Sequence, residues 1–202
     1  MVEKKQQKSE GWGLFVAVTL LIALLAIWTF TPAKIFESTW RSEQHQIIDY
    51  GGTATNEWIL SQSMSKLGDF DKSANDSIKG MNNISAVSIN VWLMERIEAS
   101  VIWANLIAYR IYIFVMWVLL GMPLVVATAV DGFYTREIYK DSFISQSPIK
   151  HKMGVKVFHL VNIALVTWLI TPFPMPFIIL PGITIIMAMS LWFWVSNLQK
   201  RL

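Results

Sequence analysis

The sequence predicts an all-α integral membrane protein with four transmembrane helices. Both ends of the chain are expected in the cytoplasm, with a helical extracytoplasmic segment between the first and second helices. Apolar residues make up 54% of the 202 residues and charged residues only 15%, whereas about a quarter of a soluble domain is charged. The apolar residues also gather in four long runs, and a helix needs about 20 such residues to cross the hydrocarbon core of a bilayer.

The first predicted transmembrane helix covers residues 12–30 and contains no charged residue. Lysines precede it in residues 1–11, as they do in a secretory signal. The apolar core of a signal peptide is only about 7–15 residues long, and Pro32 lies where a cleavage site would have to be. We therefore expect an uncleaved signal anchor that follows a short cytoplasmic N-terminus.

The second predicted transmembrane helix covers residues 109–130. Aromatic residues and Arg110 lie near its start, a pattern typical of a headgroup-level anchor with a snorkelling arginine. Asp131 and Gly132 follow the apolar run. Because glycine is common just after the last turn of a helix, we expect the helix to end there.

The third and fourth predicted transmembrane helices cover residues 155–171 and 177–196. Between them lies a proline turn at 172–176, where three prolines prevent a helix from continuing. Pro181 and Gly182 should bend the fourth helix or delay its start. The pair is either a full hairpin or a re-entrant one, and the basic tail at 197–202 favours the full hairpin.

Charge sets the orientation, because Lys and Arg concentrate in cytoplasmic segments. The segment from 131 to 156 holds five basic and three acidic residues. The segment 31–108 holds six basic and nine acidic residues. We therefore expect a cytoplasmic basic loop at 131–154 and a cytoplasmic tail at 197–202. The segment 31–108 and the turn at 172–176 are expected in the periplasm.

The segment 31–108 is polar but has helical patterns. We expect helices over 39–50 and 55–67, the second ended by Gly68, then a polar loop over 69–80. A further helix over 84–108 can continue directly into the second membrane helix. The start of the polar loop resembles a calcium loop, but its sixth position is Ala74 where glycine is required, so no calcium site is expected.

No residue pattern indicates an enzyme, a cofactor site or a metal site. The chain has no cysteine, which excludes a disulfide, a thiolate metal site and a cysteine nucleophile. His45, His151 and His159 lie on opposite predicted sides of the membrane or too far apart in sequence to form a metal site. Neither a Ser-His-Asp set nor paired intramembrane carboxylates are visible.

The main alternative function is a small oligomeric channel or transporter subunit of the bacterial inner membrane. Transport sites usually place ionisable residues inside helices. The uncharged runs of the four predicted helices, at 12–30, 111–130, 157–170 and 177–195, contain only His159 and neutral polar residues such as Asn162 and Thr167. Sequence-specific binding of nucleic acid is also unexpected. The basic segment nets only +2, too little for the phosphate neutralisation that dominates such binding.

The basic segment itself has two interpretations. It is either a solvated loop attracted to anionic lipid or a docking surface for a cytoplasmic partner. Its candidate partner-contact residues are Asp131, Gly132, Arg136, Ser147, His151 and Lys152. On the residues alone the first interpretation is favoured.

A longer pattern runs through the chain. A membrane helix ending in Val-Asp-Gly is followed by an arginine, a serine-rich turn, a histidine with a basic neighbour, a proline-containing apolar hairpin and a basic C-terminus. These positions are held by Val130, Asp131, Gly132, Arg136, Ser145, Ser147, His151, Lys152, Pro172, Pro181, Lys200 and Arg201. A weaker part follows the first helix, in Trp40, Glu43, His45, Ile47, Ile48 and Tyr50. In these residues the chain resembles a family of uncharacterised inner-membrane proteins encoded in the transfer modules of integrating conjugative elements and conjugative plasmids.

The resemblance implies a multi-pass protein of the bacterial inner membrane with a role in DNA transfer through a type IV secretion system. Genes of this family tend to lie near that of the coupling protein ATPase, which delivers DNA to the channel. The resemblance thus implies an accessory component, a scaffold or partner of the type IV coupling protein ATPase or the channel base. A homo-oligomer is a further option. The family has no established reaction, so no catalytic residue is implied.

Overall fold

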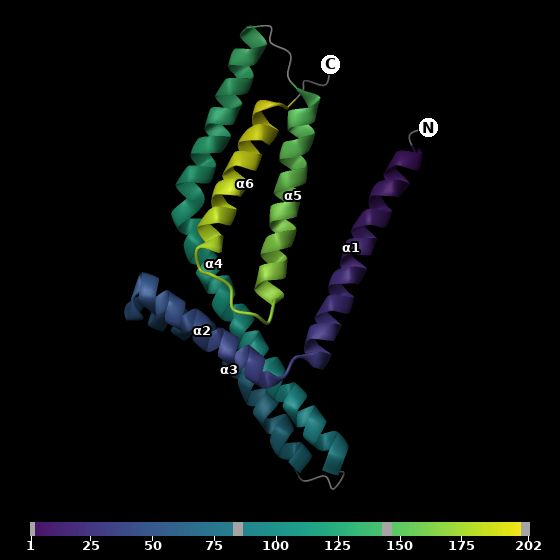
Figure 1. Cartoon of the computed structure of the whole chain (residues 1–202), viewed down its shortest axis with the longest axis vertical. Helices are drawn as coiled ribbons and strands as arrows, with labels where there is room; N and C mark the ends of the chain where they lie inside the picture. Colours follow the sequence, from purple (N-terminus) through teal and green to yellow (C-terminus); the bar gives the residue numbers. More distant parts are fainter. Residues whose placement is uncertain (1–2, 83–86, 143–146, 199–202) are drawn as a thin grey trace. The chain divides into compact units, whose positions relative to one another are not determined.

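The computed structural model describes residues 3–82, 87–142 and 147–198, and its regular structure in these ranges is helical, with no strand (Figure 1). This confirms the predicted all-helical class. The helices are α1 (Glu3–Phe30), α2 (Ala33–Gly51), α3 (Thr53–Asn82), α4 (Val87–Asp141), α5 (Pro148–Ile170) and α6 (Ile179–Ser196).

Four of these helices contain a segment long and apolar enough to cross a membrane. The segments are Gly13–Phe30 of α1, Val91–Asp141 of α4, Pro148–Ile170 in α5 and Ile179–Ser196 in α6. Each overlaps one of the four apolar runs of the sequence, and the spans in α4 and α5 extend beyond the predicted bounds. The number of candidate spans is therefore as predicted, by length and composition.

The chain divides into two compact units. The first unit comprises residues 1–42, 64–106 and 172–174, and the second comprises 43–63, 107–171 and 175–202. Helices α2, α3 and α4 contribute residues to both units.

The first unit has an apolar core where the end of α1 and the start of α2 pack against α4. Phe36, Ala99 and Leu106 are buried at its centre. The rings of Phe36 and Trp103 lie 5.5 Å apart. Burial of such aromatic surface is the main driving force for packing of this kind in water, and edge and offset contacts add to it.

In the second unit, α6 packs against both α4 and α5 (Figure 1). Glycines allow the close approach. A Cβ atom on Gly154 of α5 would lie 2.7 Å from the Trp194 nitrogen and 2.9 Å from the Ser190 oxygen of α6. A Cβ on Gly121 of α4 would overlap the Thr184 methyl group. Small residues at such contacts are typical of helices packed within membranes.

Helix α3 is longer than the sequence predicted. The expected end at Gly68 and the expected polar loop over 69–80 are both wrong, because α3 continues to Asn82. A single glycine costs a helix only about 1 kcal/mol. The following turn has the spacing of a helix, with Lys72 and Asp69 paired at its surface and the Ser73 hydroxyl donating to the Asp69 carbonyl.

Helix α4 continues from the polar segment into the apolar run, as the sequence allowed. Its predicted end at Asp131–Gly132 is wrong, because the helix extends to Asp141. Gly132 does not terminate it; a Cβ there would lie 3.3 Å from the Trp192 carbonyl oxygen of α6. The segment 131–154, expected to be a loop, is therefore helical over 131–141 and again from Pro148 onward.

The connection between α5 and α6 is non-helical over 171–178, consistent with its three prolines. Helix α6 starts at Ile179 and carries Pro181 in its first turn, where a missing amide hydrogen costs little. Helix α5 starts earlier than the predicted membrane segment. Ser147 is its N-cap, with a side chain that accepts from the Lys150 amide, and Pro148 opens the first turn.

Candidate functional site

The most highly organised polar site of the second unit surrounds Arg110 of α4. Its side chain is 0% exposed. A buried guanidinium is tolerated only when it is paired and hydrogen-bonded. Helix α2 supplies the counter-ion, and the end of α5 supplies the remaining acceptors.

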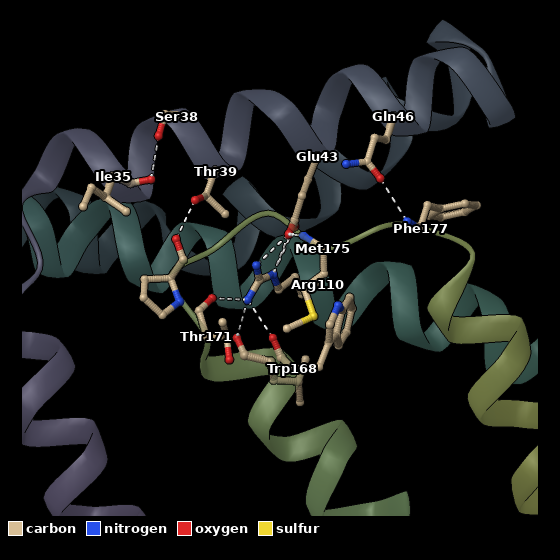
Figure 2. A network of polar contacts seen from close by, with 12 residues as sticks. Ile35, Ser38, Thr39, Glu43, Gln46, Arg110, Trp168, Thr171, Met175 and Phe177 are labelled. Atoms are coloured by element: carbon tan, nitrogen blue, oxygen red, sulfur yellow. Dashed lines mark hydrogen bonds and ion pairs between the residues drawn. The ribbon is translucent and has the colours of Figure 1, made fainter.

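The counter-ion is Glu43, which is also buried. Arg110 Nη2 lies 2.6 Å from Glu43 Oε1, and Arg110 Nε lies 3.0 Å from Oε2 (Figure 2). Two parallel bonds between a guanidinium and a carboxylate are stronger and more directional than a single one. This pair joins α2 to α4 within the second unit.

The third nitrogen of Arg110 caps the C-terminus of α5. Arg110 Nη1 donates to the carbonyl oxygens of Trp168 at 2.7 Å, Leu169 at 3.3 Å and Thr171 at 2.5 Å (Figure 2). The last four carbonyl groups of a helix have no partner within it, and a cation there also favours the helix dipole. The guanidinium additionally lies 5.5 Å from the centre of the Trp168 ring.

Helix α2 also fixes the connection that leads to α6. The Met175 amide donates to Glu43 Oε1 at 3.5 Å, and the Phe177 amide donates to Gln46 Oε1 at 2.9 Å. The ring of Tyr50 stacks on that of Phe177, with centroids 6.1 Å apart. We name Arg110, Glu43 and these contacts the hairpin clamp, because they hold the turn between α5 and α6.

Little open space adjoins the hairpin clamp. The cavity beside it, lined by Glu43, Trp168 and Phe177 among others, has a volume of about 10 Å³. This is no more than the space of one water molecule. The described geometry therefore makes the buried pair a structural element that joins helices.

The first unit holds an arginine with a similar role. Arg96 of α4 is buried, and its Nη1 donates to the carbonyl oxygens of Trp28 at 3.0 Å, Thr29 at 3.2 Å and Thr31 at 2.9 Å. Its Nη2 lies 3.0 Å from Glu95 Oε1. Arg96 thus caps the C-terminus of α1 as Arg110 caps that of α5.

The two capped ends share a sequence motif, Trp-x-x-Thr-Pro, at residues 28–32 and 168–172. In both, the arginine binds the first, second and fourth carbonyl groups of the motif. The proline keeps the chain from continuing as a helix, so these carbonyl groups need an external donor. The repeated motif, together with the two arginines Arg96 and Arg110, is the sequence signal that would have revealed the caps.

The predicted role of Arg110 as a snorkelling headgroup anchor is wrong. Snorkelling requires an exposed charged group, and this guanidinium is enclosed by protein. Asn162 and Thr167, the neutral polar residues of the third predicted span, donate to the carbonyl groups of Phe158 and Ile163 in their own helix.

Four of the six predicted partner-contact residues meet the C-terminal end of α6. Asp131 Oδ2 accepts from Trp192 Nε1 at 2.6 Å. Gly132 packs against the backbone of the same tryptophan. The Ser147 amide donates to Asn197 Oδ1 at 3.4 Å.

The fourth is His151, whose Nδ1 lies 3.3 Å from the Trp194 carbonyl oxygen. Arg136 is half-buried one helical turn beyond Gly132, and Lys152 is exposed. The structure therefore gives Asp131, Gly132, Ser147 and His151 a role in packing α4 and α5 onto α6. We name this region, residues 131–141, 147–156 and 192–197, the basic platform.

No group of three or more His, Cys, Asp or Glu side chains suited to a metal ion occurs within the part of the chain that the structure describes. No curated protein and no solved structure matches the chain. A family model does, and it agrees with the resemblance seen in the sequence. Over residues 33–201 the chain matches the DtrJ-like proteins, described as IncC plasmid conjugative DNA transfer proteins, and it therefore belongs to this family.

Proposed function

We propose that this chain is an accessory inner-membrane component of a conjugative DNA-transfer system that acts by binding other proteins of the type IV secretion machinery. Membership in a conjugative transfer family over residues 33–201 is the observation that carries this proposal. The description of the family names DNA transfer but no reaction. We infer a scaffold, not an enzyme, because the buried side chains of Arg110 and Glu43 hold helices together through their hydrogen bonds.

The membrane placement is also part of the proposal. Four helices have the length and composition of membrane spans, and the basic residues of the termini and of segment 131–156 favour a cytoplasmic location for them. On this topology the basic platform faces the cytoplasm, and most of residues 31–108 lie outside the membrane on the periplasmic side.

The basic platform is the proposed docking surface for the type IV coupling protein ATPase or another protein of the channel base. Lys150, Lys152 and Lys156 of α5 are exposed on it. Its backbone is ordered by helix–helix contacts such as Trp192–Asp131, so little conformational entropy is lost when a partner binds. A rigid surface on which five basic residues outnumber three acidic ones suits an acidic face of a soluble partner.

A channel or transporter subunit is less well supported. Ionisable residues that serve transport usually line a pathway or a water-filled cavity. Arg96 and Arg110 lie within the apolar helix α4, but each donates to three carbonyl groups at a helix end. These contacts indicate helix capping.

Copurification tests the docking proposal. The tagged chain, extracted in detergent from donor cells with an intact transfer system, should retain the coupling protein ATPase or a channel protein. The double change Arg136→Glu and Lys152→Glu should reduce that recovery, because it reverses the charge that attracts the partner.

The matched control is Lys34→Glu with Lys66→Glu, two exposed lysines of the segment expected in the periplasm. It changes the net charge equally and should leave the recovery as it is. Membrane levels of all variants are measured by immunoblot, so that loss of folding is recognised. Recovery of the chain alone, or equal recovery with both double variants, would count against the proposed docking surface.

A further inference from the structure

An apolar groove lies on the surface of the second unit between α5 and α6. Its volume is about 170 Å³. Helix α5 contributes Met153, Gly154 and Val157, and α6 contributes Ile186, Met189, Ser190 and Phe193. Met153 and Met189 are each at least half exposed. The groove is thus open to the surroundings and apolar along its length.

The groove faces away from α4. In a helix each residue turns by about 100°. On α6 the positions that approach α4, Thr184 and Trp192, lie on one side, and Ile186, Met189 and Phe193 lie on the other. Among the described residues, only those of α5 and α6 line the groove, and we infer that this side meets lipid in a membrane.

One end of the groove is basic. Lys150 precedes Met153, Gly154 and Val157 on the same stripe of α5, at the spacing of residues that share a helix face. Its side chain is exposed, and helix side chains lean toward the N-terminus, so its ammonium group lies beyond the apolar lining. Apolar contact along the groove and one cation at its end match the chemistry of a lipid with an anionic headgroup.

The surrounding sequence strengthens this charge complementarity. Residues 142–202 contain no Asp or Glu, whereas Lys150, Lys152, Lys156, Lys200 and Arg201 all belong to this segment. An anion at the end of the groove therefore meets no repulsion from the helices that form it. Basic pockets between membrane helices are known to hold the headgroups of anionic lipids.

We propose that this groove binds one anionic phospholipid, with an acyl chain between α5 and α6 and the phosphate at Lys150. The proposal rests on the membrane placement proposed above, but not on any protein partner. The bound lipid covers the exposed side of the α5–α6 contact. It also places negative charge beside the basic platform. Lipid composition then changes the net charge that a partner meets at this surface.

Lipid titration by native mass spectrometry tests this site. The full chain, purified in detergent, is titrated with dioleoyl phosphatidylglycerol and separately with dioleoyl phosphatidylcholine. We expect one equivalent of phosphatidylglycerol to bind more tightly than phosphatidylcholine. Lys150→Gln should weaken phosphatidylglycerol binding by roughly fivefold, the equivalent of about 1 kcal/mol for one basic residue near an anionic lipid.

Lys152→Gln is the matched control, because Lys152 lies about 200° around α5 from Lys150 and so points away from the groove. It removes the same charge and should change the affinity little. Met189→Trp fills the groove and should weaken the binding of both lipids. Ile163→Trp, at an exposed position about 220° from Lys150 on α5, should leave both affinities unchanged.

Equal binding of the two lipids, or equal effects of Lys150→Gln and Lys152→Gln, would overturn the proposal. Displacement of the phospholipid by millimolar inorganic phosphate would overturn it as well, since the site would then recognise a free anion. A change of oligomeric state in Met189→Trp without a change in lipid affinity would identify the groove as a contact between copies. Failure of copurification with the ATPase would leave these lipid affinities unaffected, so the two proposals fail separately.

Discussion

Arginine residues within apolar helices are the most informative side chains of this protein. Arg96 and Arg110 would each cost several kcal/mol if buried without partners. Each instead satisfies three carbonyl groups that a helix end leaves open. The same side chain thus removes two penalties, that of a buried charge and that of unpaired backbone acceptors.

The contacts of the hairpin clamp predict that Arg110→Ala strongly lowers the free energy of unfolding. The change leaves the Glu43 carboxylate buried without its partner and the last carbonyl groups of α5 without a donor. Breaking a buried pair in this way typically costs about 3–5 kcal/mol. Reversible unfolding of the purified chain in mixed detergent measures the cost, and Arg110→Lys should recover only part of it because an ammonium cannot form the two-pronged contact.

Arg41→Ala provides the control for that measurement. Arg41 pairs with Glu37 on the same helix α2 at 2.5 Å, but its side chain is 73% exposed. Exposed pairs contribute about 0–1 kcal/mol. If Arg41→Ala and Arg110→Ala lowered the free energy of unfolding by similar amounts, the buried pair would not be what holds the hairpin.

Among the helices, α3 departs most from what the sequence suggested. Gly68 and the polar residues after it have the composition of a loop, yet the helix runs through them. By contrast, Gly52 between α2 and α3 has a φ of 83°, a conformation that residues with a Cβ rarely adopt. Two glycines sixteen residues apart in a polar segment, Gly52 and Gly68, therefore have opposite structural roles.

This difference predicts opposite signs for two alanine substitutions. Gly68→Ala should stabilise the protein by about 0.5–1 kcal/mol, because alanine favours a helix interior and nothing lies within 4 Å of the new Cβ. Gly52→Ala should destabilise it by about 1–2 kcal/mol, the cost of a left-handed conformation. Thermal unfolding followed by circular dichroism compares them, and a loss of stability in Gly68→Ala would indicate that α3 ends there.

The helix ends show what the sequence could and could not predict. Apolar runs located all four candidate spans, since length and composition alone define them. The end of α4 was misplaced at Gly132 because the preference of glycine for helix ends is local, whereas its contact with Trp192 of α6 is tertiary. The pairing of Glu43 with Arg110 was missed for the same reason. Neighbouring aromatic residues suggested a membrane anchor, and the true partners lie on α2 and α5.

The predicted docking residues illustrate the same limit. Their pattern in the sequence correctly indicated a conjugative transfer family. Within the molecule, however, Asp131 and His151 contact α6. Packing between helices therefore accounts for these two residues of the pattern. The exposed cations of the basic platform are the residues left for a partner, and the proposed phospholipid site adjoins them.

For the molecule as a whole, the central proposal is that the role of this chain in conjugative DNA transfer depends on a correctly clamped helical hairpin. The most direct measurement is the frequency of DNA transfer from donors that lack this chain, complemented with variants produced at equal membrane levels. We expect transfer to fall in the deletion, to return with the natural chain and with Arg41→Ala, and to remain low with Arg110→Ala. Undiminished transfer from the deletion donor would contradict the account.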